Sequence, residues 1–109
     1  MTSFGLTSDQ FKMVEEIVVR PLQRLNVRVY VFGSRARGKH HQFSDLDILI
    51  QTTQNSLITV EVISSIKEQA EESTLPFKID LVNEQSLAES YRASVAKDLV
   101  EWPHHFTAK

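Results

Sequence analysis

A glycine–serine pair and two aspartates lie close together in the sequence, where they could bind an anion and a cation side by side. Residues 32–38 read Phe-Gly-Ser-Arg-Ala-Arg-Gly, and residues 44–50 read Ser-Asp-Leu-Asp-Ile-Leu-Ile. A third aspartate, Asp80, lies within the apolar run 77–82. Backbone N–H groups at a turn bind phosphate, and carboxylates bind divalent cations. This combination predicts a site for a nucleoside triphosphate and a divalent metal ion.

The turn at Gly33 and Ser34 follows an apolar run and is expected to begin a short helix over residues 34–38. Glycine allows close approach of the backbone to a ligand, and the Ser34 hydroxyl can hydrogen-bond a phosphate oxygen. We expect both residues to bind the nucleotide, with Arg35 and Arg37 steadying its polyphosphate. The alternative is a tight strand-to-helix turn in which Ser34 is the N-cap and both arginines are solvated.

The same residues resemble a P-loop but cannot form one. Residues 33–39 match its first seven positions, yet His40 stands where the motif needs serine or threonine. Only residues 39–44 separate the turn from the next expected strand, which leaves no room for the long helix of a P-loop. A P-loop nucleotide site is therefore excluded.

Asp45 and Asp47 are two residues apart at the start of an expected strand, so both side chains point to the same face. Their Cα atoms are then about 6.6 Å apart, close enough to share one cation. Two like charges about 4 Å apart repel by roughly 4 kcal/mol near a protein surface, so a metal ion or an arginine must compensate. The alternative is that Asp45 caps the turn and Asp47 pairs with Arg35 or Arg37. The preceding Gly-Ser turn favours the metal.

Asp80 lies between Ile79 and Leu81, where a carboxylate is costly unless it has partners. If strand 77–82 is a neighbour of strand 46–50, Asp80 can join the pair Asp45 and Asp47. Three carboxylates suit magnesium, with phosphate oxygens completing its coordination. The alternative is a lone aspartate bonded to backbone at a strand end.

Hydrophobic spacing predicts the elements that position these residues. Strands are expected at residues 27–32, 46–50 and 77–82, and helices at about 8–25 and 57–73. The first helix has a capping-box spacing at Thr7 and Gln10, and Pro21 should kink or end it. The inward residues of the second are expected to be Val62, Ile63, Ile66 and Ala70.

A last helix is expected after Ser86 and Glu89, which also have capping-box spacing, and it should stop before Pro103. Its apolar stripe would be Leu87, Tyr91, Val95 and Leu99, with Trp102 packed against it or against a partner. The expected fold class is therefore α/β (α+β), a small mixed three-stranded sheet with helices packed on one face, formed by a single domain over residues 1–109.

Composition sets limits on the class of protein. The chain has 109 residues, no cysteine and a net charge of -2, which exclude disulfides and thiolate zinc sites and give no support for nucleic-acid binding across the domain. No apolar run approaches the roughly 20 residues of a membrane span. The first ten residues lack the pattern of a signal peptide, so a cytoplasmic protein without membrane contact is expected.

The motifs Gly33-Ser34, Ser44-Asp45-Leu46-Asp47 and Lys78-Ile79-Asp80-Leu81 resemble those of the nucleotidyltransferase superfamily that includes DNA polymerase beta. The chain is most similar to its minimal nucleotidyltransferase (MNT) branch, which includes MntA-type antitoxins. The resemblance implies that Gly33 and Ser34 hold the triphosphate of ATP. It implies that Asp45 and Asp47 bind two magnesium ions, and that Asp80 shares the catalytic metal and helps to deprotonate the acceptor.

The resemblance also implies the activity and the partner. The chain would transfer a nucleoside monophosphate, AMP from ATP, to a hydroxyl on a HEPN-type partner toxin and so act as an antitoxin. Since no residues are left for a second, acceptor-binding domain, the acceptor would arrive on another polypeptide; homo-oligomers are also compatible. The alternative is a non-catalytic binding module that neutralises a HEPN partner by contact. A metal-dependent phosphatase or nuclease is a third possibility.

Overall fold

A four-stranded mixed sheet forms the centre of the protein, in a computed structural model that describes residues 4–52 and 58–103. Its strands are β1 (Val27–Phe32), β2 (Leu46–Thr52), β3 (Ile79–Asn83) and β4 (Val100–Glu101), in the order β3-β2-β1-β4. β2 and β3 are parallel, whereas β1 is antiparallel to β2 and to β4. The mixed sheet is as expected, but it has four strands rather than three because β4 adds a short edge.

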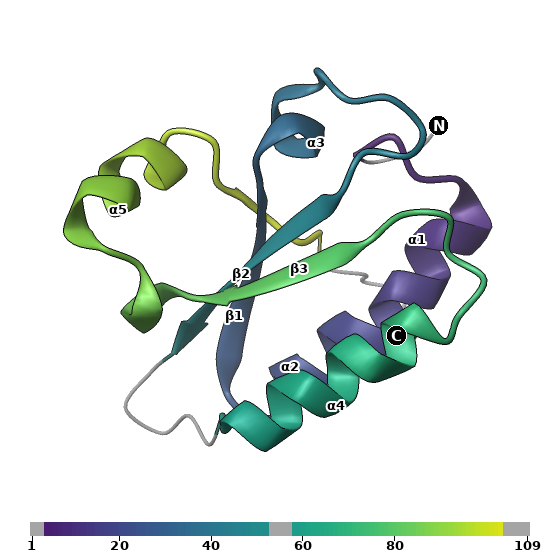
Figure 1. The fold of residues 1–109 in the computed structure, drawn as a ribbon, viewed down its shortest axis with the longest axis horizontal. Coiled ribbons are helices and arrows are strands. Elements are labelled where there is room, and N and C mark those ends of the chain that lie inside the picture. The colour runs from purple at the N-terminus through teal and green to yellow at the C-terminus, as the bar shows by residue number, and fades with distance from the viewer. Residues whose placement is uncertain (1–3, 53–57, 104–109) are drawn as a thin grey trace.

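The helices that cover the sheet lie together on one face, as the sequence predicts (Figure 1). They are α1 (Ser8–Val14), a π-helical turn (Glu15–Val19), α2 (Arg20–Gln23) and α4 (Val60–Glu71). The capping box of Thr7 and Gln10 begins α1, and the Thr59 hydroxyl caps α4. No helix in the described ranges is both long and apolar enough to cross a membrane.

The core lies between these helices and alternate residues of the strands. Strand side chains alternate between the two faces, so each strand gives one set of residues to the core. The buried strand residues of this cluster are Val27, Val29, Val31, Leu46, Ile48, Ile50, Ile79 and Leu81. The helices contribute Val14, Val18, Val19, Leu22, Ile66 and Ala70, with Val62 and Ile63 packed at the margin. Each fully buried aliphatic side chain contributes roughly 1.5–3 kcal/mol.

Pro21 does not end the helical stretch; it lies in α2, directly after the π-helical turn. The helix widens into the π-turn just before it, where the Arg20 N–H bonds to the Glu15 carbonyl, and α2 then continues through the proline. Proline has no N–H to donate and its ring displaces the carbonyl four residues earlier, so a locally wider turn accommodates it.

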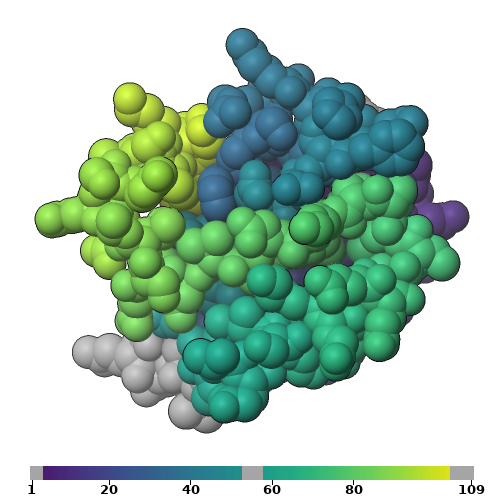
Figure 2. Space-filling model, in the orientation of Figure 1, coloured from purple at the N-terminus to yellow at the C-terminus, as the bar shows by residue number. Residues whose placement is uncertain are grey.

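The last helix differs from the expectation. It is α5 (Glu89–Ala96), it follows the 3₁₀ turn Glu84–Ser86, and its N-cap is Ala88 rather than Ser86. None of its residues is buried, and Tyr91 is 64% exposed. Figure 2 shows the yellow-green α5 region on one side of the molecule, away from α4. Of the predicted stripe, Leu87, Val95 and Leu99 are partly buried and Tyr91 is exposed, so the stripe does not form a buried core contact.

Trp102 packs on the first helix rather than on the last. Its ring stacks on Phe11 and Phe4, with centroids 4.6 and 5.5 Å away, and its Nε1–H donates to Glu15 Oε2 at 3.2 Å. This buried contact ties the end of the described chain to α1 and lets β4 add to β1.

Candidate active site

The strand register brings the aspartates together on the sheet face that the main helices leave open. Asp47 on β2 lies directly beside Asp80 on β3, and beside Phe32 at the end of β1. Neighbouring strands are about 4.8 Å apart, so the two carboxylates emerge side by side. Asp45 and Asp80 are exposed, and Asp47 is half-buried. Asp80 is exposed on the open face, and it lies beside Asp47 as the sequence predicts for neighbouring strands.

Gly33 joins this group through a close backbone approach. Its φ of 79° and ψ of -156° lie in a region that side chains other than hydrogen rarely allow. A Cβ at this position would overlap Asp47 Oδ2 and lie 3.3 Å from Asp47 Cγ. The turn that begins α3 (Ser34–Arg37) is therefore in direct contact with the central carboxylate, and only glycine leaves room for it.

Asp47 has an unusual protonation equilibrium. Burial, followed by the nearby charges of Asp80 and Asp45, raises the pKa of Asp47 to about 6, while Arg37 opposes the shift. The three carboxylates thus repel one another in the absence of a cation. A site that strains its own carboxylates in this way is a candidate for binding positive charge.

We expect Asp47→Asn to stabilise the metal-free protein. A carboxyl whose folded-state pKa is raised contributes stability below its unfolded pKa of 3.8 and loses it as pH rises through about 6. After allowance for solvent screening, the variant should gain about 1–2 kcal/mol in unfolding free energy above pH 6. Its advantage should fade towards pH 4. Denaturant titrations in EDTA across pH 4–8 measure this, and a difference independent of pH would contradict it.

Arg35 lies elsewhere than the sequence suggested. It is buried, and its guanidinium donates to the carbonyls of Ser44, Phe4 and Gln42 at 2.9, 2.8 and 3.1 Å. It also stacks on the Phe77 ring, 4.5 Å from the centroid, and burial lowers its pKa. With its donors occupied in this way it does not face a polyphosphate. Instead it joins α3 to the loop before Asp45 and to the segment before β3, and so positions the site.

Arg35→Lys should therefore destabilise the fold more than Arg37→Lys. A lysine cannot reach three carbonyls in a planar fork, and each lost charged hydrogen bond costs about 1.5–3 kcal/mol. We expect a loss of about 2–4 kcal/mol in unfolding free energy. Arg37 forms an exposed ion pair with Asp98 at 2.8 Å, which contributes at most about 1 kcal/mol. Urea unfolding of both variants tests the difference; equal losses would contradict it.

Ser34 and Arg37, two other residues predicted to bind the nucleotide, differ in their contacts. Ser34 is the first residue of α3, not its N-cap, and in the described part of the chain its hydroxyl has no hydrogen-bond partner. Arg37 is bound to Asp98 rather than to Asp47, although its charge reaches Asp47. The expected alternative, an Asp47–arginine pair, is therefore not formed.

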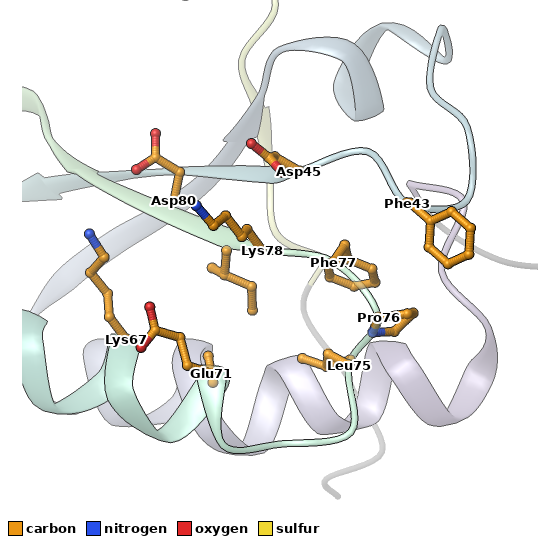
Figure 3. A pocket seen from close by; sticks show the side chains of 11 residues that line it. Phe43, Asp45, Lys67, Glu71, Leu75, Pro76, Phe77, Lys78 and Asp80 are labelled. Atoms are coloured by element: carbon orange, nitrogen blue, oxygen red, sulfur yellow. The ribbon is translucent and has the colours of Figure 1, made fainter.

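Sequence reasoning missed a cavity beside the carboxylates. It has a volume of about 680 Å³ and lies between β3 and α4 (Figure 3). Asp45 and Asp80 line it near the sheet, Lys67 and Glu71 line it from α4, and Lys78 lies between. The sequence pattern did not predict this cavity, because the exposed residues Lys78 and Phe43 belong to no hydrophobic period. The parallel pairing of β2 and β3 brings these two residues to the same cavity.

No group of three or more histidine, aspartate or glutamate side chains within residues 4–52 and 58–103 is already arranged to hold a metal ion. The donor chemistry nevertheless fits magnesium, which prefers one or two carboxylates with phosphate and water oxygens to an all-protein cage. Burial and the two acidic neighbours raise the pKa of Asp47, and a divalent cation would favour its charged form. Asp45, Asp47 and Asp80 therefore suit a metal that arrives with a phosphate ligand.

Comparisons with known proteins place the chain in a family. Residues 12–102 match the nucleotidyltransferase domain family. Haemophilus influenzae protein adenylyltransferase MntA is 32% identical over 102 residues, covering 89% of this chain and 84% of the relative. A solved structure described as a minimal nucleotidyltransferase is 30% identical, with a TM-score of 0.64 over 87% of this chain and 95% of the other.

A more distant structure shares the fold only. It is described as a tri-AMPylated Shewanella oneidensis HEPN toxin in complex with an MNT antitoxin. The matched chain is 16% identical, with a TM-score of 0.58 over 87% of this chain and 73% of the other.

Proposed function

Because the chain belongs to the nucleotidyltransferase domain family, we propose that it transfers AMP from Mg·ATP to a hydroxyl on a HEPN-domain partner and thereby acts as an antitoxin. The resemblance expected from the motifs is confirmed, and the chain is a nucleotidyltransferase. The observation that carries the finer proposal is the placement of Asp47, which contacts the Gly33 turn on one side and adjoins Asp80 on the other.

Two magnesium ions would be held by Asp45, Asp47 and Asp80 and would neutralise charge on the phosphates during an in-line displacement. Gly33 and Ser34 would hold the polyphosphate. In the described residues the Ser34 hydroxyl has no hydrogen-bond partner, and the first N–H groups of a helix such as α3 have no acceptor within the helix. Arg37 would add positive charge next to them. Arg35 would position the turn and both acidic strands without touching the nucleotide.

The reaction forms one bond and breaks one. The acceptor oxygen attacks the α-phosphorus of ATP, the bond from that phosphorus to the bridging oxygen of the β-phosphate breaks, and pyrophosphate leaves. Asp80 is exposed beside Asp47, so its carboxylate can take the proton of the attacking hydroxyl.

The partner is proposed from the relatives. MntA of Haemophilus influenzae is named a protein adenylyltransferase, and the Shewanella oneidensis MNT antitoxin is in complex with an AMPylated HEPN toxin. We infer that the acceptor of this chain is a HEPN-domain protein encoded beside it.

The test uses ATP labelled on either the α- or the γ-phosphate, with magnesium and that HEPN protein. Label from the α-phosphate should stay on the HEPN protein, and label from the γ-phosphate should leave as pyrophosphate. Inhibition of the HEPN protein without any label on it would favour the non-catalytic binding module. Hydrolysis with no transfer of label to the HEPN protein would favour a phosphatase or nuclease.

A further inference from the structure

The cavity between β3 and α4 has one end at the carboxylates and the other at two apolar rings. Its volume of about 680 Å³ is in the range of binding pockets for small molecules or side chains. Figure 3 shows Asp45 and Asp80 on one side of it and Phe43 and Pro76 farther along. We call this cavity the β3–α4 groove.

The groove and the Gly33 turn lie on opposite sides of Asp47. Gly33 follows β1, the groove borders β3, and the strand order β3-β2-β1 puts Asp47 of β2 between them. In an in-line displacement the attacking and leaving oxygens lie on opposite sides of the phosphorus. If pyrophosphate leaves on the side of Gly33, the acceptor oxygen must approach from the side of β3.

We propose that the β3–α4 groove binds the segment of the partner protein that carries the acceptor hydroxyl. This inference rests on the proposed function and adds the surface that selects the acceptor. The hydroxyl would lie beside Asp80, where its proton can pass to the carboxylate as the new bond to the α-phosphorus forms.

Two features of the groove suit a polypeptide. β3 is an edge strand of the sheet, so its outer backbone can pair with an extended segment of another chain. Phe43 is 56% exposed at the rim, where it can contact an apolar or aromatic side chain of a partner. Exposed aromatic residues beside a pocket are common anchors of protein interfaces.

The charges of the groove favour an acidic segment. Lys67 and Lys78 line it, and neither forms an ion pair with any residue that the structure describes. Of the three acidic residues that line it, Asp45 and Asp80 belong to the proposed metal site, which leaves Glu71 against two lysines. Acidic side chains flanking the acceptor would therefore be attracted, chiefly by Lys67 on α4.

The experiment measures binding and transfer separately. Phe43→Ser and Lys67→Glu are compared with two matched surface changes outside the groove, Tyr91→Ser on α5 and Lys12→Glu on α1. The dissociation constant for the HEPN protein is measured by fluorescence anisotropy in an Asp47→Asn background, which blocks turnover. The KM for the HEPN protein is measured in the active background.

Each groove variant should raise both the dissociation constant and the KM for the HEPN protein by about tenfold, because an interface anchor or a charge contact is lost. The control variants should stay within about twofold. The affinity for α,β-methylene-ATP with magnesium should be unchanged in all four. These results would support the groove as the acceptor site.

Other outcomes overturn the inference in distinguishable ways. Unchanged HEPN binding in both groove variants, or loss of binding in Tyr91→Ser alone, would reject the groove. Equal weakening of nucleotide binding would make it a nucleoside site instead. If the wild-type chain transfers no label while HEPN binding still depends on Phe43 and Lys67, the proposed catalysis fails and the groove remains a partner site.

Discussion

Asp47→Asn is expected to lower the rate of AMP transfer to the HEPN protein at least about a thousandfold while the fold remains intact. Asp47 is the central carboxylate of the site, since it contacts the Gly33 turn and lies beside Asp80. An amide keeps the shape but removes the charge that would hold magnesium. A thousandfold loss corresponds to about 4 kcal/mol of transition-state stabilisation, a usual contribution of a metal site.

The measurement is the initial rate of label transfer from α-labelled ATP under saturating magnesium. Glu72→Gln is the control for loss of a negative charge, because it neutralises a carboxylate that is exposed at the end of α4, outside the site. Its rate should be within about twofold of wild type, as expected for a surface charge. If the Asp47→Asn variant retained a tenth or more of the wild-type rate, this carboxylate would not be a metal ligand.

Gly33→Ala should damage both the fold and the candidate active site by adding a single methyl group. It forces a side chain into a region of φ and ψ that costs about 1–3 kcal/mol, and it pushes the Cβ against Asp47. We expect a loss of about 2–4 kcal/mol in unfolding free energy. We also expect transfer to fall about a hundredfold, since small displacements of a reacting group have effects of that size.

Gly38→Ala is the matched control for that change. Gly38 also has a positive φ, 74°, but its ψ of 18° places it in the left-handed helical region, and a Cβ there meets nothing within 4 Å. It should cost only about 1 kcal/mol and leave the transfer rate near that of wild type. Equal losses in the two variants, measured by urea unfolding and label transfer, would show that contact with Asp47 does not matter.

The parts of the fold that were predictable are those with a strong local pattern. β1 has the predicted bounds because its β-branched and aromatic residues end at a glycine. The third strand begins at Ile79 rather than at Phe77, because Phe77 packs under the Arg35 guanidinium. β4 has only two residues, and its pairing with β1 depends on the distant contact of Trp102 with α1.

In the candidate site, too, local sequence patterns were predictable and distant contacts were not. The motif spacing was enough to predict that Asp45 and Asp47 share one face, because strand alternation is a local rule. Asp80 lies beside Asp47 because β3 pairs with β2, a non-local contact on which the prediction depended. The burial of Arg35 was not predictable, since its partners Phe4 and Phe77 are far away in the sequence. The spacing predicts an apolar stripe on the last helix, yet hydrophobic spacing alone does not reveal whether another element covers that stripe.

The most direct test of the account is calorimetric titration of the chain with α,β-methylene-ATP, with magnesium and then in EDTA. We predict binding of one nucleotide that requires magnesium and is lost in Asp47→Asn. Binding of the same strength in EDTA, or undiminished in Asp47→Asn, would contradict the claim that the aspartates of β2 and β3 hold a metal–nucleotide complex beside the Gly33 turn.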